Sequence, residues 1–348
     1  METVGIRVDV NERVATGHFM RCATISEQLQ RMGAAAVFIS ADTQIVPFAE
    51  ERNLEYHILH SDWKHLEEET AKLISYLKGT EIRTLLVDTY LVTERYLKTL
   101  RDAGIHVLYM DDLDAMKYPV EALVNYSPGY QDGDYGKTYK DSGTKLFLGA
   151  AYVPLRAQFT QYAEEYLKRN GLHRIFLTTG GSDPMGIAEQ LIRRILSDPL
   201  FADVEIHLLA GRFYHAPESL FGGDSPFAGR LMLHQNIPNV AEIMAPCDAA
   251  VTPAGTTLYE LSACGVPSVS FVFADNQETD ALFFDKEGLI PYAGDFRENP
   301  DRCSEQIIQE LYRIAALSTE NYRKLCEKLQ SSIDGKGAQR IAEVLIRL

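Results

Sequence analysis

The sequence contains no long apolar run, and its charge is strongly one-sided. No stretch reaches the roughly 18 consecutive apolar residues of a membrane-spanning helix, so no membrane span is expected. The 348 residues include 34 Lys and Arg against 49 Asp and Glu, which gives a formal net charge of −15. Because basic surfaces bind nucleic-acid phosphates, a nucleic-acid partner is not expected. A nucleotide stays compatible with this charge, since backbone amides and helix ends can hold it.

Cysteine is scarce and scattered. The five cysteines include no CxxC pair and are Cys22, Cys247, Cys264, Cys303 and Cys326. We expect free, buried thiols in a reducing compartment. The first ten residues carry acidic side chains and lack the pattern of a secretory signal or a transit peptide, so a cytoplasmic protein is expected.

Several motifs of nucleotide and metal sites are also missing. No Gly-Lys-Ser/Thr follows the glycine-rich loops, which excludes a Walker A site, and the first half has no GxGxxG, which argues against NAD or FAD. The nine histidines form no HxxxH or His/Cys cluster. We therefore expect neither a metal nor a cofactor. The 46% hydrophobic and 24% charged residues are those of an ordinary globular protein, and the length favours two domains.

Short apolar runs alternate with helical patterns in both halves of the chain. The predicted strands are 4–10, 35–40, 84–88, 106–110 and 123–125, then 174–179, 204–209, 231–234, 249–252 and 268–273. Helices are expected around 22–32, at 96–101, from about 157, at 185–196 and at the C-terminal end, and 129–145 is expected to be a loop. This alternation predicts an α/β protein with two facing Rossmann-like domains, parallel sheets and a central cleft at the strands' carboxyl ends.

The most informative motif lies within residues 251–277. There a predicted strand is followed by Ala254, Gly255, Thr256 and Thr257, small residues that open a helix. Such a turn lets the backbone approach a ligand closely, and the free N–H groups of the helix start favour an anion. Glu260 follows one turn later, where a carboxylate can reach ribose hydroxyls. The motif predicts a nucleotide-sugar site.

A second glycine-rich turn has the same place in its strand–helix unit. Gly180, Gly181 and Ser182 follow a predicted strand and precede Asp183 and a helix. These residues can point free amides at a phosphate, or they can simply cap the helix. The presence of both turns in the same half of the chain favours the nucleotide interpretation.

In the first half, Gly17 and His18 occupy the loop between the first strand and its helix. Histidine is the side chain best suited to accept a proton near neutral pH, although a surface or helix-capping histidine remains the alternative. Polar residues also end later strands: Asp88 and Tyr90 in one case, Asp111 and Asp112 in the next. Such carboxylates can bind sugar hydroxyls, orient His18 or cap a helix.

Asn276 and Gln277 end the strand that follows the Glu260 helix. Their side-chain amides suit sugar hydroxyls or an N-acetyl group, and a plain loop is the alternative.

In these motifs the chain resembles the UDP-2,4-diacetamido-2,4,6-trideoxy-β-L-altropyranose hydrolase family of pseudaminic acid biosynthesis, and equally the spore-coat polysaccharide biosynthesis proteins of the same superfamily. The motifs that carry the resemblance are Asp9…Gly17-His18-x-x-Arg21-Cys22, Val87-Asp88-Thr-Tyr90, Met110-Asp111-Asp112-Leu113, Leu148-Gly149-Ala-Ala-Tyr152-Val-Pro154-Leu155-Arg156, Gly180-Gly181-Ser182-Asp183-Pro184, Asn236-Ile-Pro-Asn-Val240, the segment 254–260, Asn276-Gln277 and Asp334-Gly-x-Gly-Ala338. More distantly the chain is similar to the GlcNAc transferase of lipid II synthesis, which implies the GT-B architecture.

The resemblance also implies roles for individual residues. His18 would be the general base, with Tyr90 as a supporting active-site residue. The UDP-binding residues would be Gly17, Gly180, Gly181, Ser182, Ile237, Ala254, Gly255, Thr256, Thr257 and Glu260. The sugar-binding residues would be Asp88, Asp111, Tyr259, Asn276 and Gln277. The implied domains are 1–154, joined by a final helix at 337–348 and carrying the catalytic histidine, and 155–336, which would bind UDP.

The implied activity is hydrolysis of a UDP-sugar by a water molecule that His18 activates. The chain departs from the family pattern at Ala15, Thr256 and Tyr259, so the identity of the sugar stays open. Two alternatives also remain: a GT-B glycosyltransferase with a UDP-sugar donor, and a non-catalytic protein of polysaccharide assembly that binds nucleotide-sugars.

Overall fold

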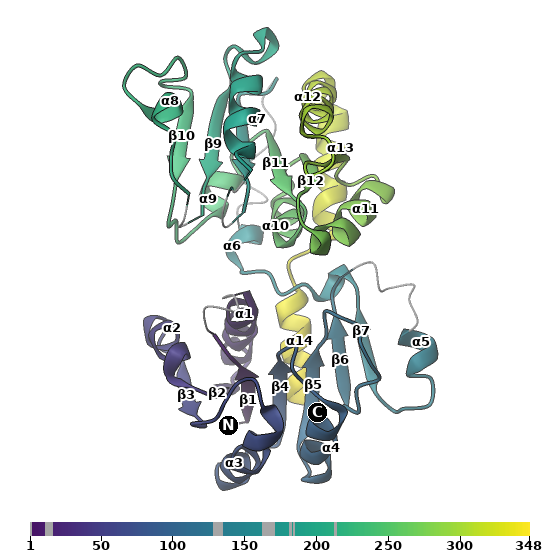
Figure 1. The fold of residues 1–348 in the computed structure, drawn as a ribbon. Coiled ribbons are helices and arrows are strands. Elements are labelled where there is room, and N and C mark those ends of the chain that lie inside the picture. The colour runs from purple at the N-terminus through teal and green to yellow at the C-terminus, as the bar shows by residue number, and fades with distance from the viewer. Residues whose placement is uncertain are drawn as a thin grey trace. The chain divides into compact units, whose positions relative to one another are not determined.

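The computed structural model describes residues 2–10, 17–127, 135–161, 171–180, 183, 185–211 and 214–348. Its contacts divide the chain into two compact units. Unit 1 comprises Met1–Arg156 together with Lys336–Leu348, and unit 2 comprises Ala157–Gly335. Each unit contains one parallel β-sheet with helices on both faces (Figure 1).

Unit 1 is built on a seven-stranded sheet with the order β3-β2-β1-β4-β5-β6-β7, in which all neighbouring strands are parallel. The strands are β1 (Thr3–Val8), β2 (Ala35–Ser40), β3 (Glu55–Ile58), β4 (Thr84–Asp88), β5 (His106–Met110), β6 (Ala122–Asn125) and β7 (Lys145–Leu148). Strands β4 and β6 are buried along their whole length. Their continuous apolar runs are typical of a parallel sheet that is covered on both faces.

Two helical layers cover the sheet of unit 1. Helix α1 (Gly17–Arg31) and helix α14 (Gly337–Arg347) pack on one face, with α2 (Val46–Glu51) nearby. Helices α3 (Leu66–Gly79) and α4 (Glu94–Asp102) pack on the other, and the short segments α5 (Tyr135–Thr138), η1 (Thr43–Ile45) and η3 (Ala150–Tyr152) complete the unit.

Helix α14 joins unit 1 although it follows unit 2 in the chain. Its apolar face places Ile341 and Leu345 in the same core as Phe19 and Ile25 of α1. The first residue of α14 lies so close to the backbone that a Cβ on Gly337 would be 2.1 Å from the carbonyl oxygen of Val153. Glycine is therefore required at this approach.

Unit 2 is built on a six-stranded parallel sheet with the order β10-β9-β8-β11-β12-β13. The strands are β8 (Arg174–Thr178), β9 (Glu205–Leu209), β10 (Leu231–His234), β11 (Ala249–Pro253), β12 (Ser268–Val272) and β13 (Tyr292–Asp295). The helical segments are α6 (Gln158–Gln161), α7 (Ile187–Leu196), η4 (Pro199–Phe201), α8 (Glu218–Phe221), α9 (Ala241–Met244), α10 (Thr256–Cys264), η5 (Asp275–Gln277), α11 (Glu278–Lys286), α12 (Pro300–Ala316) and α13 (Thr319–Ser332).

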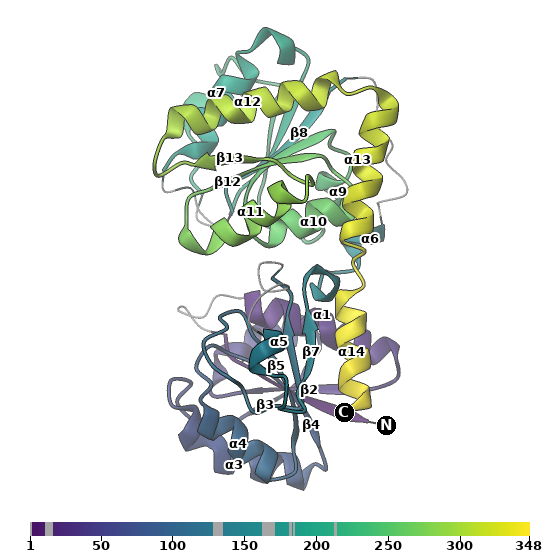
Figure 2. The same cartoon turned by 90° about the vertical axis from the view of Figure 1, so that its right-hand side faces the viewer.

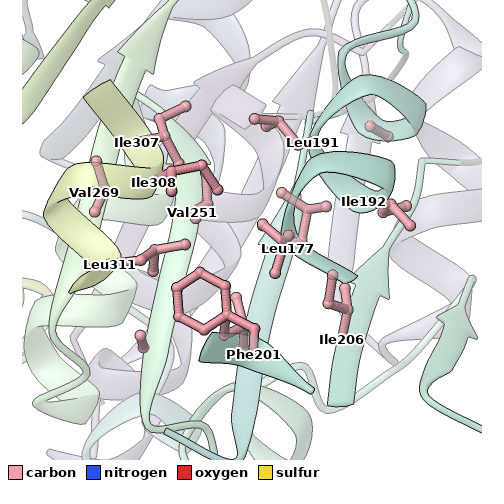
Figure 3. Packing of buried hydrophobic residues seen from close by; sticks show 14 of the residues in the cluster. Leu177, Leu191, Ile192, Phe201, Ile206, Val251, Val269, Ile307, Ile308 and Leu311 are labelled. Carbon is pink, nitrogen blue, oxygen red and sulfur yellow. The ribbon is translucent and has the colours of Figure 1, made fainter. Parts of the chain in front are cut away.

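The core of unit 2 lies between its sheet and the helices α7 and α12 (Figure 2). Leu191 of α7 and Ile307 and Leu311 of α12 are fully buried there against Val251 of β11. Phe201 fills the space at one end of this cluster (Figure 3). Helix α10 contacts α9 and α13, so the second helical layer of the unit forms around it.

The ten predicted strands are confirmed to within one or two residues. Three further strands were not predicted, namely β3, β7 and β13. All three lie at sheet edges, where partial exposure removes the continuous apolar run that identifies a buried strand. The expected loop at 129–145 is wrong in its described part, which contains α5 and the first residue of β7. The helix expected from residue 185 begins at Ile187, because Gly186 adopts the left-handed conformation before it.

Each sheet has one place where the strand order reverses. In unit 1 it lies between β1 and β4, and in unit 2 it lies between β8 and β11. Ligands of open parallel α/β sheets bind at such switch points, outside the carboxyl ends of the strands. The segments that leave these ends are α1 and the residues after Asp88 in unit 1, and the Gly180 turn and α10 in unit 2.

Candidate active site

At the switch point of unit 1, the imidazole of His18 is paired with a carboxylate. His18 lies in the first turn of α1, and its Nδ1 is 2.5 Å from Oδ1 of Asp88, the last residue of β4. An ionised carboxylate only accepts hydrogen bonds, so Nδ1 is the nitrogen that carries the proton. This leaves the lone pair on Nε2, the nitrogen that can accept a proton from another molecule.

The His18 side chain is mostly covered, with 10% of its surface exposed. Its Nε2 makes no hydrogen bond to the described residues and is not among the buried polar atoms that lack a partner. The ring is thus held firmly at one nitrogen and open to solvent at the other.

The Asp88 carboxylate is buried and ionised. Burial alone would raise its pKa, but the charge and hydrogen bonds of Arg21, together with the bond from His18, hold the pKa well below its ordinary value. Cys22 lies beside it, with Sγ 3.4 Å from Oδ2. Burial and the Asp88 charge raise the pKa of the Cys22 thiol, so this sulfur stays protonated and donates to the carboxylate.

Arg21 is the centre of a wider network. It donates to both oxygens of Asp88 at 2.6 Å, to the oxygens of Asp112 at 2.9 and 2.7 Å, and to the Tyr126 hydroxyl at 2.8 Å. The network joins α1 to the carboxyl ends of β4, β5 and β6. His18 and Arg21 share this face of α1 because residues three apart lie on the same side of a helix.

Tyr90 stands at the edge of the imidazole. The ring centroids of His18 and Tyr90 are 4.6 Å apart and the planes meet at 80°. Half of the tyrosine is exposed. Burial of the remainder, followed by the Asp112 charge, raises the pKa of the Tyr90 hydroxyl above its usual value, so it remains a neutral donor at physiological pH. The structure therefore brings His18, Asp88 and Tyr90 together at one edge of the sheet.

Gly17 precedes this group as the exposed first residue of α1. No described atom would lie within 4 Å of a Cβ at this position. The described neighbours therefore leave room for a side chain at position 17 and do not explain the glycine.

In unit 2, the start of α10 is open to an anion. Its N-cap residue is Gly255, with φ +152°, and no side chain caps the helix within the described residues. Ala254 before it is buried and donates its N–H to the Phe271 carbonyl, whereas Thr256 is exposed and Thr257 half-buried. Glu260 follows on the same helix, half-buried. Unsatisfied N–H groups and the helix dipole make such a start a site for a phosphate.

The Gly180 turn differs from the start of α10. Gly180 has φ +81° and follows β8, while Gly181 and Ser182 lie outside the described residues. The Asp183 carboxylate accepts from the N–H groups of Ile187 and Ala188 at 2.8 and 2.9 Å. The first turn of α7 is thus capped by the protein itself, as the alternative interpretation of this motif expected.

Two expected sugar contacts are not supported by the geometry. Asp111 is buried and accepts from the Tyr135 hydroxyl and from the N–H groups of Leu113 and Asp114. Tyr259 is 1% exposed and packs edge-on against Phe284, and its hydroxyl donates to Asp280 at 3.0 Å. The hydrogen-bonding groups of both buried side chains therefore have partners inside the protein.

The remaining predicted residues lie on loops of unit 2. Gln277 uses its Oε1 to accept from the N–H groups of Phe273 and Ala274 at 2.9 and 3.2 Å, so its carbonyl holds the loop after β12. The side chain of Asn276 lies outside the described residues. Ile237 is half-buried after β10 and follows Asn236, which has a positive φ of 54°.

Sequence reasoning gave no role in the site to Arg21 or Tyr126, and it named Asp112 only as one of two adjacent carboxylates at a strand end. Arg21 had one usable indication, its place three residues after His18 in the Gly17-His18-x-x-Arg21-Cys22 motif. Asp112 stands next to Asp111, and only the structure shows which of the two adjacent carboxylates faces Arg21. Tyr126 follows β6 without any motif around it.

The described part of the chain shows neither a cluster of metal ligands nor a transmembrane helix. No group of three or more His, Cys, Asp or Glu side chains there is arranged to hold a metal ion. None of the helices in that part is both long and apolar enough to cross a bilayer.

Solved structures share this architecture over the whole chain. MurG of Acinetobacter baumannii superimposes with a TM-score of 0.69 at 13% identity, covering 100% of both chains. The spinosyn rhamnosyltransferase SpnG with thymidine diphosphate gives 0.65 at 13% identity, covering 99% of this chain and 100% of its own. UDP-GlcNAc 2-epimerase from Neisseria meningitidis gives 0.66 at 12%, covering 100% of both. The chain has the GT-B fold. At these identities the likeness concerns the fold alone.

Sequence relatives of this GT-B chain are distant. The spore coat polysaccharide biosynthesis protein SpsG of Bacillus subtilis is 23% identical, over 98% of this chain and 97% of that protein. The pseudaminic acid cytidylyltransferase and UDP-2,4-diacetamido-2,4,6-trideoxy-β-L-altropyranose hydrolase of Helicobacter pylori is 22% identical over 79% of this chain. The protein MJ1062 of Methanocaldococcus jannaschii is 22% identical over 76%. The chain spans about half the length of these last two, 45% and 54%. No family model matches the chain.

Proposed function

We propose that this GT-B protein hydrolyses a UDP-linked amino or deoxy sugar to UDP and the free sugar, within the biosynthesis of a surface polysaccharide or a nonulosonic acid. The observation that carries the proposal is the His18–Asp88 pair, in which Nδ1 is held by the carboxylate and Nε2 is open. Such a pair is suited to accept a proton from a nucleophile.

In the proposed reaction, His18 Nε2 takes a proton from a water molecule as the water oxygen bonds to the anomeric carbon. The bond from that carbon to the phosphate oxygen breaks, and its electron pair leaves with UDP. Attack opposite the leaving group inverts the anomeric centre. Asp88 stabilises the imidazolium that forms, and the neutral Tyr90 hydroxyl is proposed to hydrogen-bond the sugar or the water.

Unit 2 is proposed to bind the nucleotide. The uncapped start of α10, with Gly255, Thr256 and Thr257, suits the diphosphate, because N–H groups there stabilise the charge that develops on the leaving UDP. Glu260 is proposed for the ribose hydroxyls, and the loop around Ile237 for the base. The Gly180 turn is a weaker candidate, since Asp183 already caps the helix that follows it.

The relatives support nucleotide-sugar chemistry. One is named for spore coat polysaccharide biosynthesis, and the name of another joins a cytidylyltransferase to a UDP-sugar hydrolase. The chain matches less than half of that second protein, so the hydrolase activity in that protein's name is only proposed for this chain.

The decisive experiment measures release of UDP from a panel of UDP-linked N-acetylated and deoxy sugars, with and without sugar or lipid acceptors. A hydrolase releases UDP and free sugar at the same rate in both conditions, and NMR of the fresh product shows the inverted anomer. UDP release that requires an acceptor would instead identify a glycosyltransferase in which the same base deprotonates a hydroxyl. Binding of the UDP-sugar without turnover would identify a non-catalytic assembly protein.

The first variant to test is His18→Ala. Loss of the base should lower the rate about 10²–10⁴-fold while UDP still binds. His57→Ala is the matched control: it removes a different imidazole of unit 1, which is half-buried on β3, two strands away from β1. Wild-type turnover in His18→Ala would refute the assignment of the base.

A further inference from the structure

Arg21 has no part in the proposed proton transfer, yet every N–H of its guanidinium is committed beside the base. Nε and Nη2 donate to Asp88, Nη1 and Nη2 donate to Asp112, and the second hydrogen of Nη1 goes to the Tyr126 hydroxyl. The side chain is only 10% exposed. A buried guanidinium with five bonds has one orientation, and it fixes the orientation of the Asp88 carboxylate with it.

Arg21 also stands next to the imidazole itself. Its Nη2 is 3.1 Å from His18 Nδ1. The two hydrogens of Nη2 point to Asp88 and Asp112, and the proton on Nδ1 points to Asp88. The short Nη2–Nδ1 approach is therefore a contact between two donors. A positive charge on the imidazole would lie directly beside the positive guanidinium.

Among the described residues, five groups from three elements belong to the network around His18. Two are acidic, Asp88 at the end of β4 and Asp112 after β5, and one is basic, Arg21 on α1. The Cys22 thiol and the Tyr90 hydroxyl stay neutral near physiological pH. Arg21 is thus the one cation among these five groups, set against the two carboxylates that would otherwise stabilise a protonated ring.

We infer that Arg21 is a positioning residue for the proposed base: it fixes the Asp88 carboxylate that selects the Nδ1-protonated tautomer, and its cation opposes a second positive charge on the ring beside it. The inference rests on the proposed function for its kinetic consequence. Its electrostatic consequence holds whether or not the protein turns over a sugar.

The direction in which replacing Arg21 should move the pH profile follows from its charge. In Arg21→Gln the two carboxylates lose their cation, so the imidazolium is stabilised and the ring stays protonated to higher pH. The acidic limb of the kcat/KM profile should move upward by about one pH unit. At neutral pH the rate should fall by up to about tenfold and recover as the pH is raised. KM and UDP affinity should change less than about twofold, because the proposed nucleotide contacts lie in unit 2.

The variants Arg21→Lys and Arg7→Lys distinguish the effect of the charge at position 21 from the effect of losing a buried arginine's hydrogen bonds. Lys at position 21 keeps the cation but cannot bridge two carboxylates, so the limb should stay in place while kcat falls. Arg7 is the matched control, a fully buried arginine of unit 1 bound to Glu69 at 2.6 and 2.9 Å and to Asp9 at 2.7 Å. Arg7→Lys should lower stability and leave the limb unchanged.

An NMR titration of the His18 ring, assigned by its loss in His18→Gln, tests the inference without a substrate. The midpoint should rise by about one pH unit in Arg21→Gln and stay in place in Arg7→Lys. Asp112→Asn should shift the midpoint in the opposite direction. It removes a carboxylate that is 23% exposed and keeps Arg21, so the midpoint should fall. This variant decides the question if Arg21→Gln does not fold.

The outcomes distinguish the two claims. Equal midpoints in wild type, Arg21→Gln and Asp112→Asn would overturn the inference, and so would an upward shift in Asp112→Asn. If no UDP-sugar is turned over by the wild type but the midpoints shift as expected, the hydrolytic proposal fails while the role of Arg21 stands.

Discussion

At the scale of residues, three side chains converge on one carboxylate. Asp88 accepts hydrogen bonds from His18, Arg21 and Cys22 while itself buried at the end of β4. A buried carboxylate with such partners is costly to remove, because each partner loses its acceptor. Its bond to Nδ1 also decides which nitrogen of His18 is free to accept a proton.

Asp88→Asn tests whether the carboxylate selects the tautomer of His18. The amide keeps the shape but can donate to Nδ1, which favours the wrong tautomer, so kcat/KM should fall about 10²–10⁴-fold. The control is Asp111→Asn, at the end of the neighbouring strand, where the carboxylate is bound to Tyr135 and to backbone N–H groups. That variant should lose stability with little effect on kcat of the folded fraction. Equal kinetic losses in the two variants would contradict the role given to Asp88.

At the scale of elements, the two helix starts of unit 2 behave differently although both follow glycine-rich turns. The start of α7 is capped by Asp183, whereas α10 begins at Gly255 without a side-chain cap. An open helix start keeps its N–H groups available for a ligand, and a capped one does not. The contrast makes α10 the stronger candidate for the diphosphate.

Gly255→Ala should weaken UDP binding. A Cβ at φ +152° strains the turn and stands where the backbone would approach a phosphate, so the Kd for UDP should rise about tenfold and the free energy of unfolding should fall by about 1 kcal/mol. Calorimetric titration with UDP and thermal unfolding measure the two effects. Gly265→Ala, at the other end of α10 with φ +71°, should lose stability and keep UDP affinity. Unchanged binding in Gly255→Ala would remove α10 from the proposed site.

At the scale of the whole molecule, two separate cores hold two units, and the last helix returns to the first. Ile341 and Leu345 of α14 complete the core in which α1 lies, and α1 carries both His18 and Arg21. The orientation of the proposed base therefore depends on residues more than three hundred positions later in the chain. Unit 2 has its own core around α7, α12 and the central strands.

Ile341→Ala tests whether the two units unfold separately. Truncating a fully buried side chain should cost unit 1 about 2–5 kcal/mol, and hydrogen exchange should quicken in α1, α14 and β1. The amides of unit 2 should keep their protection. Leu311→Ala is the reciprocal variant, with the loss expected in unit 2. A uniform loss across both units in either variant would show that they unfold together.

Much of the fold was predictable from local sequence. Strands such as β4 and β11 are short, continuous apolar runs between polar boundaries, and such runs are unambiguous once helical patterns alternate with them. The edge strands β3, β7 and β13 were not predictable, because half-exposed strands carry mixed residues. Pairing with one neighbour, rather than their own composition, makes them strands.

The candidate site was likewise predictable only in part. The sequence alone determined that this is an α/β protein and that His18, Asp88 and Tyr90 stand at strand and helix ends, since both follow from local patterns. The tertiary structure decided which groups meet. The order of the sheet places β4 beside β1, so Asp88 reaches His18, whereas Asp111 turns to Tyr135 and Tyr259 turns to Phe284. Contacts between residues distant in the chain depend on strand order and side-chain direction, and neither is encoded in any single segment.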